Sequence, residues 1–393
     1  MCNRYSISFF FDSTEMTHET DGRIFLFVLC LIALVIVWEH NIKLVPSSVF
    51  ALALGMIVSF IWNSTTSSAF NFAPELFLYL LLPPILLNSA FKFKMSSLRQ
   101  NWLSSVTFAT VGTFLSMLWI AWGLVVWAGV TPGVALIFAS ILAPTDTVAT
   151  LALTRSVETN DKYIFEVLEN ESLMNDALSV VLVRLFTAMD DANRDMDKWV
   201  PFEIISLSLL CTLLAIMFGT GLAWLVNRFE MKDLTSHYLL ALFVYTTCEC
   251  LEVSGILGLF AYGAMVRPSS DFVKSVASLS TIIEAYVYLM LGLALHTYKF
   301  ESFGTSVMIF ISCLVGRVLV VFLLGGCLKG AGRHKWTVKT LLFFSMCGVR
   351  GAISYALCLS LDNVFAKSTT FVVIACSVFV FGTLQKCLFT MLL

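Results

Sequence analysis

Charged residues are scarce in this sequence. Only 13% of the 393 residues are charged, whereas 59% are hydrophobic, which is well above the apolar fraction of an ordinary soluble domain. The formal net charge of -2 shows no basic excess, so the chain offers no electrostatic footprint for nucleic acid. This balance predicts an all-α polytopic membrane protein with no nucleic-acid partner.

Several chemical signatures are also absent. The 11 cysteines are scattered through mostly apolar segments, without a CxxC pair or a Cys/His cluster of metal-ligand spacing. Neither a GxSxG motif nor an aspartyl pair in a GxGD setting occurs, as an intramembrane hydrolase would need. The first twenty residues lack the basic region and short apolar run of a cleavable signal peptide. We expect no disulfide framework, no zinc site, no cofactor and no enzymatic activity.

Long apolar runs fill most of the chain. A transmembrane helix needs about 20 mainly apolar residues, and this criterion predicts thirteen spans. We expect them at about 23–38, 44–62, 74–91, 102–127, 132–154, 164–189, 202–227, 236–252, 254–267, 275–296, 303–328, 340–360 and 367–390. The chain then consists of a short extracytoplasmic segment, 1–22, and a transmembrane domain, 23–393.

Lysine and arginine are distributed unevenly between the predicted loops. Of the 24 basic residues, 15 fall on one side of the membrane, 6 on the other and 3 within the spans. Because cytoplasmic loops carry the excess of basic residues, this places the N-terminus outside and the C-terminus in the cytosol. The acidic loop from Met189 to Trp199 then lies outside, and so does Asn63, the glycosylation candidate in an NST sequon.

Eight charged residues fall deep within the predicted spans. They are the acids Asp146, Glu171, Asp176, Glu249 and Glu284 and the bases Arg184, Arg317 and Arg350. A charge at the bilayer centre costs about 2.5 to 3.5 kcal/mol on insertion scales, so these side chains must face one another or water. We expect Arg184, near the outer end of its span, to extend to the interface. Five acids against two arginines leave carboxylates that must hold a proton or a cation, which indicates a cation or proton pathway.

The stretch LENESLMNDALSVVLV places three of the polar residues together. Glu171 and Asn175 are four residues apart and share one helix face, and Asp176 follows at about 100° on the same inward side. Asp176 lies near the middle of its span, and so does Asp146 in the preceding, antiparallel span. We therefore expect two carboxylates to meet halfway across the membrane.

The span around Asp146 contains a helix breaker. Pro144 removes a helix hydrogen bond and clashes with the preceding turn, so we expect a broken helix that exposes Thr145, Thr147 and freed carbonyl oxygen atoms. Broken helices at this depth are how secondary transporters present oxygen ligands to ions. The alternative to an ion site is a simple proline kink in which the polar groups of Asp146 have hydrogen-bond partners within the protein.

A second interruption occurs at the corresponding place in the other half of the chain. In CGVRGAIS, Gly348 and Gly351 flank Arg350. Matched interruptions indicate two inverted repeats, at about 23–189 and 236–390, joined by a linking helix at about 202–227, whose broken helices cross near the midplane. A glycine pair that only serves close helix packing is the alternative.

These motifs resemble the monovalent cation:proton antiporters, the family that holds the electroneutral sodium/proton exchangers. The family's ESxxND helix is similar to NESLMNDALSVVL, its broken helix to APTDTVATLAL, its crossing GxRGA helix to GVRGAISYAL and its LPPI segment to LLPPILLNSAFKFK. Three further helices are similar to CECLEVSGILG, IIEAYVYLMLGL and CLVGRVLVVF. The resemblance runs in order from about Leu80 to Leu384.

The resemblance implies a homodimer of thirteen-span subunits that works by alternating access, with a core bundle carrying both broken helices moving against a dimerisation bundle. It implies electroneutral exchange of a monovalent cation for a proton, with sodium favoured over potassium or lithium. We expect the plasma membrane rather than an organelle membrane. A potassium/proton exchanger, a family member that no longer transports and a channel are the alternatives, and the sequence has no filter-like repeat typical of a channel.

The resemblance also implies which residues contact the ion. Asp176 corresponds to the carboxylate that takes either a proton or the cation, so it would hold sodium transiently together with Asp146. Asp146 and Thr145 correspond to residues of the unwound helix, and Asn175 to the polar partner that replaces a second acid in electroneutral members. The family commonly has proline directly after the first aspartate, where this sequence has Thr147.

Further charged residues correspond to structural positions of the family. Glu171 matches an acid that pairs with an arginine. We favour Arg317 as its partner and place Arg350 at the helix crossing, although the sequence leaves the choice between them open. Glu249 and Glu284 match helix acids on a possible ion route.

Overall fold

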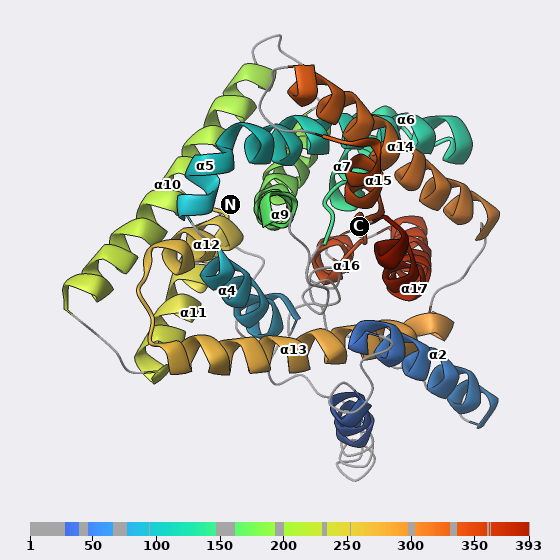
Figure 1. The fold of residues 1–393 in the computed structure, drawn as a ribbon, viewed down its shortest axis with the longest axis horizontal. Helices are drawn as coiled ribbons and strands as arrows, with labels where there is room; N and C mark the ends of the chain where they lie inside the picture. The colour runs from blue at the N-terminus through green and yellow to red at the C-terminus, as the bar shows by residue number, and fades with distance from the viewer. Residues whose placement is uncertain are drawn as a thin grey trace.

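The computed structural model describes residues 28–38, 46–65, 77–93, 95–146, 162–192, 200–229, 234–251, 253–297, 303–330, 336–359, 361 and 363–392. Within these residues every regular element is a helix, which confirms the predicted all-α fold (Figure 1). The predicted N-terminal segment 1–22, the residue Thr147 and the side chain of Asn63 lie outside the described part of the structure.

The first half of the chain ends in a long helix that carries the ESxxND motif. An unlabelled helix covers Val28–Trp38. It is followed by α2 (Ser47–Thr65), the π-helix η2 (Phe77–Leu81), α4 (Leu82–Lys92), α5 (Met95–Val106), the π-helix η3 (Thr107–Gly112), α6 (Thr113–Ala128), α7 (Pro132–Leu142) and α9 (Lys162–Ala192).

The second half begins with the linking helix. Its elements are α10 (Val200–Arg228), α11 (Leu234–Cys250), α12 (Gly255–Met265), α13 (Ser270–Leu293), the 3-10 helix η4 (Ala294–Thr297), α14 (Phe303–Gly330), α15 (Val338–Met346), α16 (Ala352–Leu359) and α17 (Val364–Leu392). Each predicted span overlaps one or more of these helices. Six helices in the described part of the chain are long and apolar enough to cross a membrane, and the total of thirteen crossings stays a prediction.

The turn between α6 and α7 shows how the chain sets the start of the first broken helix. Gly129 follows α6 with a φ of 63°, a left-handed conformation that glycine adopts without steric cost. Three residues later Pro132 occupies the first turn of α7, where its missing N–H would have had no helical partner. A short turn of this kind folds α7 back against α6, and the two helices pack together.

The helices form two groups. In Figure 1, α4 and α10–α13 lie on the left and along the bottom, and α6, α7 and α14–α17 lie on the right, with α9 between them. We call α2, α4 and α10–α13 the scaffold bundle, because these helices contact one another and enclose most of the largest buried apolar cluster. We call α5–α7, α9 and α14–α17 the core bundle, which holds two further apolar clusters. Helix α9 packs against α7 in the core bundle and against α10 in the scaffold bundle, so it lies at their boundary.

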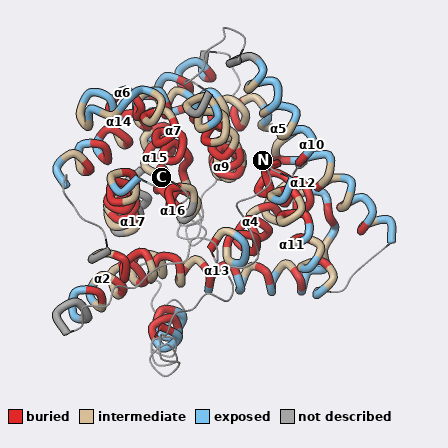
Figure 2. The backbone as a smooth tube through the Cα atoms, turned by 180° about the vertical axis from the view of Figure 1, so that it is seen from behind, coloured by how far each residue is buried: buried red, intermediate tan, exposed pale blue. Residues whose placement is uncertain are grey.

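The outer surface of the scaffold bundle is apolar. Figure 2 shows exposed residues along much of α10, and large side chains there are more than half exposed: Leu207, Leu209, Leu213, Met217 and Trp224. A soluble protein rarely exposes so continuous an apolar face, whereas lipid tails solvate one readily. The surface therefore agrees with a polytopic membrane protein.

Glycine allows two close helix crossings within the scaffold bundle. A Cβ atom on Gly219 of α10 would collide with the carbonyl oxygen of Gly258 in α12. At the contact of α2 with α13, a Cβ atom on Gly292 would lie 2.5 Å from the carbonyl oxygen of Leu52. Because lipid supplies no hydrophobic force between helices, close backbone packing of this kind contributes much of their association.

We predict that Gly219→Ala destabilises the scaffold bundle by about 1–3 kcal/mol, because the added methyl group overpacks a backbone contact. The matched control is Gly221→Ala, two residues further along α10, where an added Cβ has no atom within 4 Å. The midpoint of thermal unfolding in detergent should fall for Gly219→Ala and stay level or rise for Gly221→Ala. Equal midpoints for the two variants would contradict the close crossing.

Candidate functional site

The first broken helix ends at the site. The helical hydrogen bonds of α7 stop at the Ala143 amide, which donates to the Ala139 carbonyl at 2.8 Å. Pro144 has no N–H and its ring clashes with the preceding turn, so the helix cannot continue through it. The chain is non-helical from Ala143 to Asp146, and carbonyl groups at this end are left outside the helical ladder.

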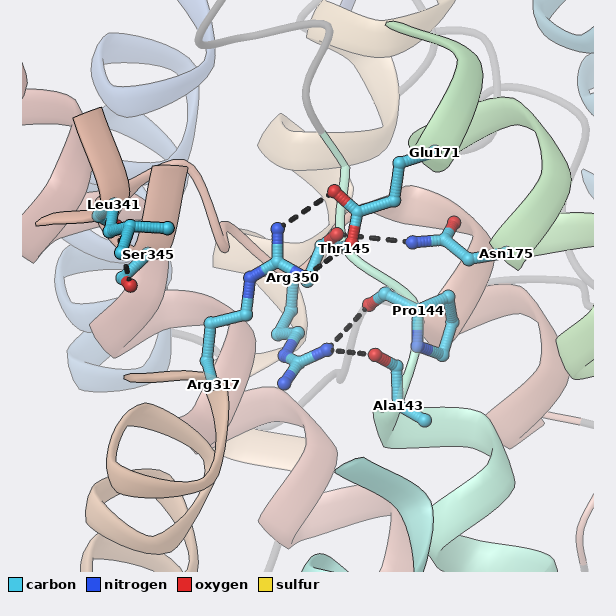
Figure 3. Close-up of polar contacts among 9 residues, drawn as sticks. All are labelled: Ala143, Pro144, Thr145, Glu171, Asn175, Arg317, Leu341, Ser345 and Arg350. Atoms are coloured by element: carbon cyan, nitrogen blue, oxygen red, sulfur yellow. Dashed lines mark hydrogen bonds and ion pairs between the residues drawn. The ribbon is translucent and has the colours of Figure 1, made fainter. Parts of the chain in front are cut away.

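Arg350 binds these freed carbonyl groups, as Figure 3 shows. Its Nη1 donates to the carbonyl oxygen of Ala143 and, at 2.8 Å, to that of Pro144. The carbonyl end of a helix carries a partial negative charge, which favours a cation there. Arg350 is itself buried and belongs to the interruption between α15 and α16. The second break therefore caps the first.

The two interrupted segments also touch through their backbones. The Asp146 amide donates to the Val349 carbonyl at 2.7 Å, and the Arg350 amide donates to the Ser377 hydroxyl of α17 at 3.2 Å. A Cβ atom on Gly351 would collide with the Asp146 carboxylate, so glycine is what allows this approach. The contact between the two interruptions that the sequence predicts is therefore observed up to Asp146, and the residues that follow it, 147–161, lie outside the described part of the chain.

A buried ion pair lies beside the crossing. Arg317 of α14 donates through Nη1 and Nη2 to the two carboxylate oxygens of Glu171 in α9, the latter contact at 2.9 Å (Figure 3). Both side chains are buried, and a bidentate pair of this kind fixes orientation as well as charge. The guanidinium also lies 5.3 Å from the centre of the Phe344 ring, within cation–π range. The sequence left two arginines open as partners of Glu171, and the structure places Arg317 there.

The polar residues of α9 face the unwound end of α7. Asn175 Nδ2 donates to the Thr145 hydroxyl at 3.1 Å, and both side chains are buried. Ser179, one turn further along, donates to the Ser140 carbonyl at 2.5 Å and holds α9 against α7. Asp176 is half-buried and lies close enough to Asp146 for their charges to interact. Two carboxylates, a hydroxyl, an amide and freed carbonyl groups therefore gather at one place.

This set of groups suits a weakly held alkali cation. All of its ligand atoms are oxygens, and unwound carbonyl groups with carboxylates are what secondary transporters offer to sodium. Within the described residues no group of three or more His, Cys, Asp or Glu side chains could hold a metal ion.

Arg184, which we expect at the interface, has a partner that the sequence did not indicate. Its Nη2 donates to both carboxylate oxygens of Glu249, at 3.0 and 2.9 Å, and Glu249 also accepts from the Gly255 amide at 2.8 Å. This pair links α9 of the core bundle with α11 and α12 of the scaffold bundle. The partner could not be predicted because Glu249 is 65 residues away along the chain, and local spacing does not give its distance in space.

The two acids on the possible ion route have different surroundings. Glu249 is engaged by Arg184, so its position is explained by an ion pair between the bundles. Glu284 lies on α13, where it accepts from the Ser280 hydroxyl at 2.8 Å. Tyr288, which the sequence did not single out, lies one helical turn further along α13, and its buried hydroxyl has no hydrogen-bond partner among the described residues. Its spacing of four residues from Glu284 places both side chains on one face of the helix, and this could have identified Tyr288 from the sequence.

Within the described residues, the fold and the site define an all-helical membrane protein of the secondary-transporter type, in which two interrupted segments meet beside half-buried carboxylates. The family described as "Sodium/hydrogen exchanger, transmembrane" matches residues 26–391. The chain belongs to this sodium/hydrogen exchanger family.

Individual relatives agree with the family. The chain is 26% identical to "Sodium/hydrogen exchanger 1" of Dictyostelium discoideum over 93% of its own length and 59% of that protein. It is 25% identical to "Sodium/hydrogen exchanger 8" of Homo sapiens, over 89% of this chain and 67% of the relative. The low-affinity Na+/H+ antiporter of Synechocystis sp. is 24% identical, over 89% of this chain and 69% of that relative. The chain thus spans about three fifths of the first of these relatives and about two thirds of the other two.

A solved structure has the same fold. The sodium proton antiporter from Methanocaldococcus jannaschii matches this chain with a TM-score of 0.73 at 19% identity. The match covers 93% of this chain and 97% of that structure, so the likeness extends over nearly the whole fold.

We predict that Glu171→Gln lowers folded yield and thermal stability, because the buried Arg317 charge loses its partner. Removing one member of a buried pair typically costs about 3–5 kcal/mol. The control is Glu203→Gln on α10, whose side chain is exposed. Fluorescence-detected gel filtration and thermal unfolding would measure both variants. Normal yield and stability with an altered cation affinity would instead move Glu171 into the transport site.

Proposed function

We propose that this protein is a secondary antiporter that exchanges a monovalent cation, with sodium favoured, for a proton across a membrane. The observation that carries the proposal is the position of Asp176 and Asp146, two carboxylates that meet beside the unwound end of α7. Membership of the family and the names of the relatives support the same activity.

The exchange follows from the position of Asp176. A carboxylate that is withdrawn from water is disfavoured in its charged form unless a cation accompanies it. Asp176 is half-buried and next to a second carboxylate, so it holds either a proton or the transported cation. Competition of the two for one carboxylate couples their movements in opposite directions.

The neighbours of Asp176 set the stoichiometry and the ligands. Asn175 cannot ionise, so this pair handles one positive charge in each direction, and the exchange is electroneutral and one-for-one. Thr145 and Asp146 supply the further oxygen ligands on the unwound segment. One of these ligands is neutral and the other negatively charged, as a cation site requires.

The fixed charges have a structural role in this proposal. Arg350 holds the crossing through the carbonyl groups of Ala143 and Pro144, and Arg317 neutralises Glu171. Neither arginine is then available to neutralise Asp176. The transported ions are left as its counter-charges.

Alternating access would move the core bundle, with both breaks, against the scaffold bundle. The ion pair of Arg184 with Glu249 crosses the boundary between these bundles and must adjust during such a movement. We further propose two inverted repeats, a homodimer and residence in the plasma membrane with the N-terminus outside. The apolar outer face of α10 is free for contact with lipid or a second subunit.

We predict that Asp176→Asn abolishes exchange and leaves a folded protein, because the amide mimics the permanently protonated carboxylate. Exchange is measured in proteoliposomes as proton flux driven by sodium, potassium or lithium gradients. The matched control is Asp271→Asn in the exposed first turn of α13, which should exchange like the wild type. Lower pH should weaken the apparent cation affinity of the wild type without lowering its maximal rate at saturating cation.

Two outcomes would contradict the proposal. Sustained exchange by Asp176→Asn would remove the role of the carboxylate. A wild-type exchange rate that responds strongly to an imposed membrane potential would rule out the one-for-one stoichiometry.

A further inference from the structure

A polar stripe runs along the inner face of α13. Ser280, Glu284 and Tyr288 follow one another at intervals of four residues, so they share one side of the helix over about 12 Å. Ser280 and Tyr288 are buried, and the Ser280 hydroxyl donates to Glu284. Leu279 and Ile282, on the opposite side, are exposed apolar residues. In the predicted orientation the stripe leads from the cytosolic half of the membrane towards the crossing.

Tyr288 lies at the inner end of this stripe. Its side chain is only 3% exposed and belongs to the same buried cluster as Val349, whose carbonyl accepts the Asp146 amide. Helix α13 also packs against α16, which follows the second interruption. Tyr288 is therefore buried where the scaffold bundle contacts the interrupted segment of the core bundle, within electrostatic range of Asp146 and Glu284.

The hydroxyl of Tyr288 has no hydrogen-bond partner within the described part of the chain. Burying an unpaired hydroxyl costs free energy, and a phenylalanine would fill the same apolar space without that cost. The ring is explained by its packing, but the hydroxyl is not. The oxygen of this unpaired hydroxyl has lone pairs that no described protein group uses, so it can serve as a ligand for a cation.

We propose that Tyr288 is a specificity-determining residue whose hydroxyl oxygen is the scaffold bundle's ligand to the monovalent cation held by Asp146 and Thr145. The inference rests on the proposed antiport function and deepens it. A phenol oxygen has two lone pairs for a cation, and its proton can at the same time point towards a carboxylate such as Glu284. Because the ligand sits on a rigid helix of the opposite bundle, it sets how large a dehydrated cation fits.

The test compares Tyr288→Phe with the wild type in proteoliposomes at fixed pH. We expect the apparent KM for sodium to rise about five- to tenfold, because the cation loses roughly one contact with a neutral oxygen atom. The maximal rate at saturating sodium should be kept, and the preference for sodium over potassium should fall. Thermal stability without sodium should not decrease, and the stabilisation by added sodium should become smaller.

Two further variants make the test specific. Tyr286→Phe removes a hydroxyl from the same helix at a half-buried position outside the stripe and should leave the KM unchanged. Tyr288→Met keeps an apolar side chain without a hydroxyl and should reproduce the rise in KM. It also replaces Tyr288→Phe if that variant does not fold.

Three results would overturn the assignment. The first is an unchanged KM for sodium in Tyr288→Phe. The second is a lower unfolding midpoint and a lower maximal rate at an unchanged KM, which would indicate a structural role. The third is a shifted pH dependence of exchange at an unchanged KM, which would mean that the hydroxyl acts on the proton and not on the cation. The proposed antiport is judged separately: if the wild type exchanges, Asp176→Asn does not and Tyr288→Phe has a normal KM, only the role of Tyr288 fails.

Discussion

The contact of Arg350 with the carbonyl groups of Ala143 and Pro144 is the interaction on which the rest of the site depends. Pro144 ends α7 inside the protein, where exposed carbonyl groups would otherwise lack partners at a depth that water does not supply. Arg350 satisfies them from the other interrupted segment, and the backbone bond from Asp146 to Val349 joins the same two segments. One buried guanidinium thus makes two broken helices into a single unit that can carry an ion site.

The distribution of fixed charge around that unit determines what the site can do. Arg317 pairs with Glu171 and Arg184 pairs with Glu249. These two arginines therefore hold helices together, within the core bundle and at its boundary with the scaffold bundle. Asp176 lies on the same helix as Glu171, yet its neighbours are a carboxylate and neutral oxygen groups. In the proposed function, a mobile proton or cation is therefore its counter-charge.

Much of this arrangement could be predicted from the sequence, because it depends on local chemistry. Apolar runs predicted the helices, Pro144 predicted the break, and the spacing of Glu171 and Asn175 predicted a common face. The partners across the fold could not be predicted. The pairing of Arg184 with Glu249 and the approach of Tyr288 to Asp146 depend on how the two bundles face each other, which is set by tertiary packing rather than helical period.

The central claim is that a proton and a cation compete for one carboxylate, Asp176. The most direct test counts the protons released when sodium binds to the purified protein, by titration calorimetry in buffers of different ionisation enthalpy at a pH where the site is protonated. The account predicts close to one proton released for each sodium bound in the wild type and no linked release in Asp176→Asn. Sodium binding without proton release in the wild type would contradict it.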